Sequence, residues 1–243
     1  MMYFPDLRAR RFTIRMRELT IGQSLDLAAR SIHLEQSNTT AFLRAATINP
    51  DLDPALWRVG ERMLAVAHYL ACVTNDADFT VGAGHYSDYL VSEIDVIPDS
   101  VALGDVIGEA WNMRHLTGRL AEAIERIVIN GLKGRGLWLM GMMAAQMYRV
   151  GEASPDDMTE GALDEWLTAR VQSFIDLPES EFEAMLIAFH AGRSMLAHLF
   201  IIDADDQGIL CRAHTEDAGL PPARFSIRSN LSAWARAVAA QPD

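Results

Sequence analysis

The pattern of apolar and polar residues changes its period close to the start of the chain. Between residues 11 and 17 the two kinds of side chain alternate, which is the period of a half-buried strand. The alternating sets are Phe12, Ile14 and Met16, which are apolar, and Thr13, Arg15 and Arg17, which are polar. Thr20-Ile21-Gly22-Gln23 follows with the form of a capping box. We therefore expect a strand that runs directly into a helix.

After residue 22 the apolar residues recur every three to four positions, as in amphipathic helices. Helices are predicted over 23–35, from a cap at Ser37 or Asn38 through Leu43, from Pro54 to Leu70, for one turn at 86–90, twice between Val101 and Ile129 with a break at 115–118, over 137–150, over 162–175, from Glu179 to about Ile202, and after a cap at Ser229 or Asn230. Short strands are predicted at 79–81, as a partner for residues 12–16, and at 225–227. The polar segment 203–217 is predicted to be a loop.

These elements predict a mainly α protein with a small β element, an α+β fold whose helical body carries an N-terminal strand. Residues 1–22 form the β segment, 23–150 the helical core and 162–243 a set of C-terminal helices packed on that core. Between them, 151–161 is acidic and contains a Ser-Pro-Asp-Asp run, which is typical of an exposed connector. We expect one globular unit, with this connector as the candidate boundary between two domains.

The charge of the chain limits the partners that it can bind. The sequence has 243 residues, 50% hydrophobic content and a formal net charge of −12 at pH 7. It can bury a large core, and its negative charge repels a phosphate backbone. The N-terminal arginines at positions 8, 10, 11, 15 and 17 are the exception, and on the polar face of a strand they are expected to be solvated and to protect an exposed edge. No nucleic-acid partner is predicted.

Two further features point to a cytoplasmic chain without membrane contact. The N-terminus lacks the apolar run of a secretory signal. The most apolar stretch, 137–147, covers about eleven residues, whereas a span across a bilayer takes roughly twenty. Cys72 and Cys211 have no metal-ligand spacing and are expected to be reduced, buried thiols.

Candidate catalytic and metal-binding residues are scattered along the sequence. His190 and His198 are the only histidine pair that a helix could place on one face, and roughly 12 Å of helical rise would separate them, too far for one metal ion. Ser87 and Ser194 do not fit the nucleophile-elbow pattern. The glycines at 131, 134 and 136 fit neither a Walker nor a dinucleotide pattern. No catalytic, cofactor or metal residue is predicted.

Methionine is concentrated in one predicted helix, at positions 140, 142, 143 and 147. The favoured interpretation is a buried central helix, because residues 142 and 143 cannot point at the same neighbour. The alternative is a soft recognition surface of a chaperone or assembly scaffold, since methionine side chains adapt to irregular partners.

Two segments resemble proteins of one functional group. Phe12-Thr-Ile-Arg-Met-Arg-Glu-Leu-Thr-Ile-Gly-Gln23 resembles the opening of tail-assembly chaperones and of small baseplate or tail assembly proteins of tailed bacteriophages. His115-Leu-Thr-Gly-Arg-Leu-Ala-Glu-Ala-Ile-Glu125, followed by Trp138, is similar to a Leu-Thr-Gly helix start in such proteins. The resemblance implies a non-enzymatic protein of tail morphogenesis, either an assembly factor or a tail-tip subunit.

The implied partners are other tail or baseplate proteins or the tape-measure protein, with a homo-oligomer as a further option. The implied location is the host cytoplasm during assembly, and the virion tail if the protein remains there. Under this hypothesis the strand contacts the partner. The candidate partner-binding residues are Phe12, Ile14, Met16, Arg15 and Arg17.

Two alternatives from other functional classes stay open. One is an α-helical hydrolase or lyase with His68, His115 or His190 as base, which requires two of these histidines and a carboxylate to converge in one pocket. The other is a phage-encoded or bacterial protein that binds and blocks a host protein, for which an acidic surface is suitable.

Overall fold

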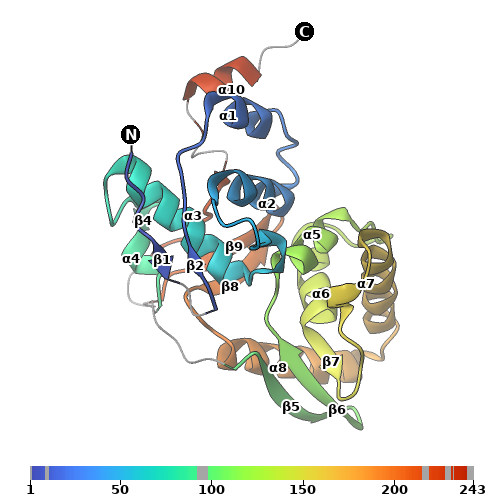
Figure 1. Ribbon diagram of the computed structural model, residues 1–243. Helices are drawn as coiled ribbons and strands as arrows, with labels where there is room; N and C mark the ends of the chain where they lie inside the picture. Colours follow the sequence, from blue (N-terminus) through green and yellow to red (C-terminus); the bar gives the residue numbers. More distant parts are fainter. Residues whose placement is uncertain are drawn as a thin grey trace.

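The computed structural model describes residues 2–8, 11–91, 98–214, 219–227, 231 and 233–239 (Figure 1). Helices make up about 49% of the structure and strands about 20%. The strands of these residues form four small antiparallel sheets. The fold is therefore a mixed α+β fold, and the N-terminal β element predicted from the sequence is one of several.

The N-terminal strand is present and pairs within the chain. β1 (Leu7–Arg8) and β2 (Thr13–Ile14) form an antiparallel pair, and Met16 makes an isolated bridge to Thr47. Ile14 is 0% exposed and Met16 is 4% exposed, whereas the residues between and beside them face outward. The half-buried alternation predicted from the sequence is confirmed.

The strand partner predicted at 79–81 is wrong. β3 (Thr80–Val81) pairs instead with β4 (Gly84–His85), the strand that follows it. Gly82 occupies the turn between them with φ at 60°, a left-handed conformation that glycine adopts without steric cost. Because the turn is this short, β3 pairs with the strand that follows it in the sequence and not with residues 12–16. The single helical turn predicted next is confirmed as α4 (Tyr86–Tyr89).

The transition from strand to helix follows local signals. α1 (Ile21–Ala28) begins at a complete capping box. The backbone N–H of Gln23 donates to Thr20 Oγ1 at 3.3 Å, and the backbone N–H of Thr20 donates to Gln23 Oε1 at 2.9 Å. The helix ends earlier than the predicted Glu35.

The N-terminus of the second helix is capped by a distant side chain. α2 (Glu35–Ala46) begins before the predicted cap at Ser37 or Asn38. The backbone N–H groups of Gln36 and Ser37 donate to the Glu125 carboxylate at 2.7 and 3.2 Å. The local sequence cannot show this cap, because it comes from another helix.

The helix predicted from Pro54 is divided. A short 3₁₀ segment, η1 (Pro54–Leu56), comes first and is capped by the Asp53 side chain. α3 (Val59–Thr74) follows after a break at Trp57 and Arg58. Within α3 most side chains are buried on more than one face, so this helix lies in the interior.

The helix predicted from Val101 is wrong, because this segment is a β-hairpin. β5 (Ser100–Val106) and β6 (Glu109–Arg114) pair antiparallel, and β7 (Met147–Arg149) adds a third strand. Ile107 and Gly108 make the turn, both with positive φ, at 51° and 81°. Such a two-residue turn matches the right-handed twist of the paired strands.

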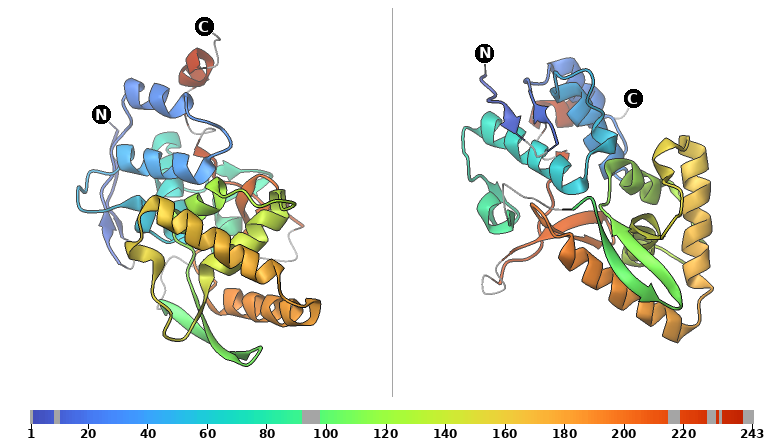
Figure 2. Two further views of the ribbon diagram at one scale, coloured as in Figure 1. Left: turned by 90° about the vertical axis from the view of Figure 1, so that its right-hand side faces the viewer. Right: turned by 60° about the horizontal axis from the view of Figure 1, so that its bottom comes forward.

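This hairpin packs against the helix that closes the same side of the molecule, α8 (Glu179–Met195) (Figure 2). A Cβ placed on Gly192 would stand 2.5 Å from Met113 Sδ and 2.7 Å from Leu103 Cδ2. Gly192 therefore allows the helix to approach the hairpin closely. α8 also ends before the predicted Ile202.

The remaining helices are α5 (Gly118–Arg126), α6 (Gly134–Gln146), α7 (Glu160–Ile175) and α10 (Ala233–Ala239), with η2 (Pro155–Asp157) inside the acidic connector. Of the two helices predicted between Val101 and Ile129, only the second is present, as α5, and Thr117 caps it. α7 packs against α5 and α6, and α10 packs against α1 at the opposite end of the molecule (Figure 1). No helix of the described residues is long and apolar enough to cross a bilayer.

The loop predicted at 203–217 is also wrong over most of its described part. β8 (Ile201–Asp205) and β9 (Gly208–Arg212) form a hairpin. The strand predicted at 225–227 is not formed, and the chain instead makes an isolated bridge between Cys211 and Ala223. Residues 215–218 and the predicted helix caps Ser229 and Asn230 lie outside the described residues.

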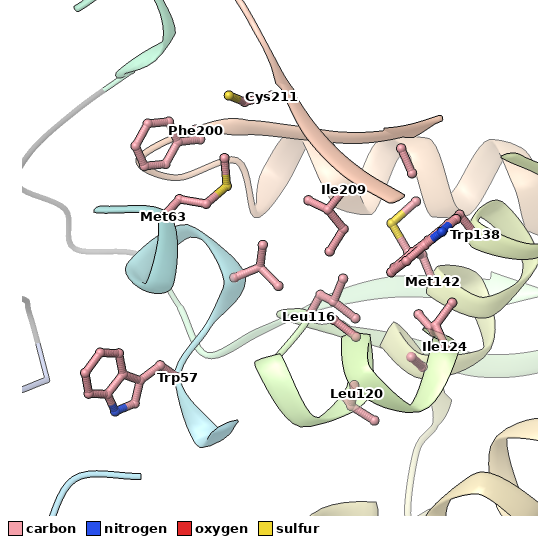
Figure 3. Packing of buried hydrophobic residues seen from close by; sticks show 14 of the residues in the cluster. Trp57, Met63, Leu116, Leu120, Ile124, Trp138, Met142, Phe200, Ile209 and Cys211 are labelled. Carbon is pink, nitrogen blue, oxygen red and sulfur yellow. The ribbon is translucent and has the colours of Figure 1, made fainter. Parts of the chain in front are cut away.

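One hydrophobic cluster joins the elements, with members from Ile14 to Leu231. Figure 3 shows Met63 of α3, Ile124 of α5 and Met142 of α6 pointing into the same interior. The methionines at 140, 142, 143 and 147 are all buried. α6 is therefore the buried central helix that the sequence favours, and its methionines do not form an exposed recognition surface.

Candidate functional site

The apolar residues predicted to contact a partner belong to the core of this chain. Ile14 and Met16 are buried members of the main hydrophobic cluster, and Phe12 packs against it. The Phe12 ring lies 4.9 Å from the ring of Trp57, measured between centroids. This face of the strand is covered by the chain itself and is not available to a partner.

The arginines of the same set face outward. Arg15 and Arg17 are exposed, and the Arg17 Nε donates to the Ala45 carbonyl at 3.3 Å. Arg11 differs, because its guanidinium makes two hydrogen bonds to the Glu61 carboxylate, at 3.0 and 2.8 Å. Arg11 is therefore paired with a carboxylate, whereas Arg15 and Arg17 face outward.

A cavity of about 480 Å³ gathers the histidines and arginines of several elements. It lies where the start of α3, the segment before α5, the end of α6 and the end of α8 meet the β8–β9 hairpin. Its polar lining consists of Arg58, His115, Gln146, His190, Arg193, Ser194, His198 and Arg212. No described Asp or Glu lines it, although the chain carries a net charge of −12. We call it the Arg/His cavity.

The rest of the lining is largely apolar. It is formed by Val59, Leu116, Met142, Leu196, Phe200, Ile201 and Ile202. Leu116 and Met142 also belong to the main hydrophobic cluster (Figure 3). The cavity thus borders the core and combines apolar with cationic lining residues, and small-molecule sites likewise combine an apolar lining with a few polar groups.

Arg58 is held at the N-terminus of α3. Its guanidinium pairs with the carboxylate of Asp99, which is itself exposed. Its backbone N–H donates to Glu61 Oε2 at 2.8 Å. Asp99 therefore holds the guanidinium, Glu61 holds the backbone, and the side chain is buried in the lining of the cavity.

Arg193 and Arg212 share one carboxylate. Arg193 Nη1 lies 3.9 Å from Asp203 Oδ1, and Arg212 Nε lies 3.6 Å from Asp203 Oδ2. Arg193 also donates to the Ile202 carbonyl. Burial lowers the pKa of Arg193, but an arginine remains charged under all ordinary conditions. Two positive charges therefore face one negative charge here.

The imidazoles of His115 and His198 lie edge to face, with ring centroids 6.4 Å apart. His115 Nε2 lies 3.0 Å from the Pro98 carbonyl oxygen. Burial and the nearby Arg58 lower the pKa of His115 to about 4. Burial and Arg193 lower the pKa of His190 as well. The imidazoles of His115 and His190 are therefore mainly neutral at pH 7.

Of the three histidines proposed from the sequence as catalytic bases, the structure brings two together. His115 and His190 both line the Arg/His cavity, whereas His68 lies elsewhere, with Nε2 at 2.9 Å from the Pro5 carbonyl oxygen. The helix face predicted for His190 and His198 is not formed, because α8 ends at Met195. His198 reaches the cavity in the turn after that helix.

Sequence reasoning missed the arginines of this site. Arg58 stands between Trp57 and Val59, and a charged residue inside an apolar segment was the available signal. Arg212 gives no such signal, because it ends a strand that was predicted to be a loop. No group of three metal-ligand side chains occurs among the described residues.

The cysteines are not part of the site. Cys72 and Cys211 do not form a disulfide. Cys211 is buried, and burial raises its pKa to about 12, so its thiol is unreactive. Cys72 is only partly buried, in contrast to the expectation from the sequence.

A second polar cluster lies inside the core between α2, α3 and α5. Arg62 is 1% exposed, and its Nη2 donates to the Gln36 carbonyl at 2.6 Å. Its Nη1 lies 3.7 Å from Glu122 Oε1. Burial raises the pKa of the neighbouring Glu125 to about 7. The cluster joins three helices and is structural in character.

No family model, curated protein or solved structure matches this chain. The function proposed below therefore depends on the resemblance of two sequence segments and on the geometry described above.

Proposed function

We propose that this protein acts in the assembly of the tail or baseplate of a tailed bacteriophage, through contacts with other tail proteins and without catalysis. The observation that supports this proposal most is the unit formed by β2, the capping box at Thr20 and α1. The resemblance to tail assembly proteins rests on this segment, and the segment has the strand-to-helix form that the resemblance implies. The proposed location is the host cytoplasm during assembly.

The proposed contact surface is the pair of helices α1 and α10, because the apolar face of β2 is buried. The two helices pack together at one end of the molecule (Figures 1 and 2). Both expose large apolar side chains: Ile21 is 55% exposed, Trp234 is 56% exposed and Val238 is 40% exposed. Exposed tryptophan is enriched among the residues that dominate protein interfaces. The proposed occupant is another tail or baseplate protein of the same phage.

Deletion of the gene from its phage or prophage genome tests this proposal. Lysates of the deletion strain are expected to contain heads without complete tails in electron micrographs, and the wild-type gene supplied in trans restores the tails. Trp234→Glu is expected to fail in this complementation. Ile187→Glu is the matched control, because Ile187 is an exposed apolar residue of α8 away from this surface.

Complete, infectious tails in the deletion strain would contradict the proposal. That result would favour a protein that blocks a host protein, since loss of such a protein leaves assembly intact. A genome that contains no tail genes would contradict the proposal as well.

A second candidate function is favoured by the convergence of His115 and His190 in the Arg/His cavity. It is a hydrolase or lyase that acts on an anionic substrate, with one of these imidazoles as base. The carboxylate that this function also requires is absent from the described lining, and the neighbouring Asp99 and Asp203 pair with arginines of the lining. Hydrolysis of p-nitrophenyl phosphate or acetate that is abolished by both His115→Gln and His190→Gln would support this function, and equal rates in these variants would exclude it.

A further inference from the structure

The Arg/His cavity has the charge of an anion site. Its lining includes three guanidinium groups, and two carboxylates, Asp99 and Asp203, pair with them from outside the described lining. Among the described residues, three guanidinium groups line the cavity and no carboxylate does. An acidic chain with net charge −12 concentrates positive charge at this place, which favours an anionic ligand by Coulomb attraction.

The cationic groups are positioned before any ligand arrives. Asp99 holds Arg58, and Arg193 is held by the Ile202 carbonyl and lies beside Asp203. Arg212 is held less firmly, with Nε 3.6 Å from the same Asp203 carboxylate. Guanidinium groups fixed by carboxylates lose little conformational freedom when they bind an anion. Their N–H groups come from α8, β9 and the start of α3, and so approach from more than one direction.

This arrangement of donors suits phosphate better than carboxylate. A phosphate monoester carries up to two negative charges and three terminal oxygens, each of which accepts hydrogen bonds. A carboxylate carries one charge and two oxygens in one plane, and a single arginine can satisfy it. A site with donors on several walls is therefore matched to the tetrahedral dianion.

The size of the cavity indicates that the ligand is larger than inorganic phosphate. Its volume is about 480 Å³, within the range of about 300–1,000 Å³ that is typical of sites for small organic molecules. Half of the lining is apolar, with Leu116, Met142 and Phe200 among its members. An apolar or aromatic part of the ligand would bury its surface there.

We infer that the Arg/His cavity binds a small organic phosphate, with the phosphate group held by guanidinium groups among Arg58, Arg193 and Arg212 and the organic part against apolar lining residues such as Leu116, Met142 and Phe200. This site is separate from the α1–α10 surface of the proposed tail function. It goes beyond that function and neither requires it nor follows from it.

Calorimetric titration of the full-length chain with phenyl phosphate tests the inference at pH 7.5. The expected result is one site per chain, with an affinity at least about tenfold greater than that for inorganic phosphate or benzoate, since each of these lacks one half of the matching chemistry. Arg212→Gln is expected to weaken phenyl phosphate binding by about tenfold or more. The Arg212 side chain is largely exposed, so this variant is expected to fold.

The matched control is Arg236→Gln, which removes an exposed arginine from α10 and so changes net charge equally away from the cavity. Equal binding by Arg212→Gln and Arg236→Gln would overturn the inference, as would undetectable binding of phenyl phosphate at millimolar concentration. Equal affinity for benzoate would overturn the choice of phosphate. Stoichiometric binding of zinc chloride that is lost in His115→Gln would assign the cavity to a metal instead.

Complementation of the deletion phage separates the two proposals. Arg212→Gln is expected to restore tails while it loses phenyl phosphate binding. Trp234→Glu is expected to bind phenyl phosphate normally while it fails to restore tails. Each proposal can therefore fail without the other.

Discussion

Gly118 lies directly against the guanidinium of Arg62. A Cβ placed on Gly118 would stand 2.6 Å from Arg62 Cζ and 2.9 Å from Arg62 Cδ. Neither group has room to move, because Arg62 is fully buried and held by Gln36 and Glu122. The first residue of α5 therefore has to be glycine for reasons of space, and the Leu-Thr-Gly segment that begins this helix serves the packing of α3.

We expect Gly118→Ala to lower the free energy of unfolding by about 2–4 kcal/mol, because it overpacks a buried ion pair. Urea denaturation followed by circular dichroism measures this change. Gly161→Ala is the control, since a Cβ on this helical glycine meets nothing within 4 Å, and it is expected to be neutral or slightly stabilising. Equal stability of the two variants would show that Arg62 does not occupy this space.

We expect the raised pKa of Glu125 to make the free energy of unfolding fall as the pH rises. Burial raises its pKa from 4.5 to about 7. Between these values the unfolded chain has lost the proton while the folded chain keeps it, so the unfolded state binds fewer protons and is favoured by rising pH. The free energy of unfolding is expected to fall by on the order of 2–3 kcal/mol over this range. Urea midpoints of Glu125→Gln should lack this decline between pH 5 and 7, and an unchanged decline would refute the assignment.

We expect the lowered pKa of His115 to have the opposite effect, so that the free energy of unfolding falls as the pH falls. Burial and Arg58 lower its pKa from 6.5 to about 4, so between these values the unfolded chain binds the proton and the folded chain does not. Stability is therefore lost as the pH falls from about 6.5 to 4, by roughly 1–2 kcal/mol after screening is considered. In His115→Gln this acid loss should be smaller, as measured by thermal unfolding across the pH range. An identical acid loss in the variant would assign it to other groups.

The two faces of β2 are expected to differ sharply in their tolerance of charge. Ile14→Asp buries an unpaired carboxylate in the core and is expected to prevent folding. Thr13→Asp changes the adjacent exposed residue and should alter the free energy of unfolding by no more than about 0.5 kcal/mol. Circular dichroism and size-exclusion chromatography distinguish the outcomes. A folded Ile14→Asp protein would place this side chain at the surface.

The elements that could be predicted from the sequence are those whose determinants are local. The alternation around Ile14 and the capping pair Thr20 and Gln23 lie within a few residues of one another, and both appear in the structure. The burial of the methionines near residue 142 followed from the apolar content of a single segment. In these cases no distant residue was needed.

The β5–β6 hairpin could not be predicted because its turn gives a misleading signal. Ile107 occupies a left-handed conformation with φ at 51°, which a β-branched residue rarely adopts. A Val-Ile-Gly sequence therefore does not suggest a tight turn. Leu103 adds to the difficulty, since the register shifts at this point and disturbs the strict alternation.

The Arg/His cavity could not be predicted because its residues are distant in sequence. Arg58, His115 and Arg212 come from segments that only the folded chain brings together. The sequence allowed a test of convergence for the histidines, and the structure shows that His115 and His190 share one cavity. The arginines that dominate its charge carried no local motif.

The packing of α10 on α1 also bears on how the chain is made. The ribosome releases α1 early and α10 last among the described helices, so the first helix lacks its neighbour for on the order of ten seconds or more at ordinary translation speeds. During this interval the apolar side of the nascent helix is open to holdase chaperones or to other emerging chains. Pairing of α1 with α10 therefore waits until α10 has left the ribosome.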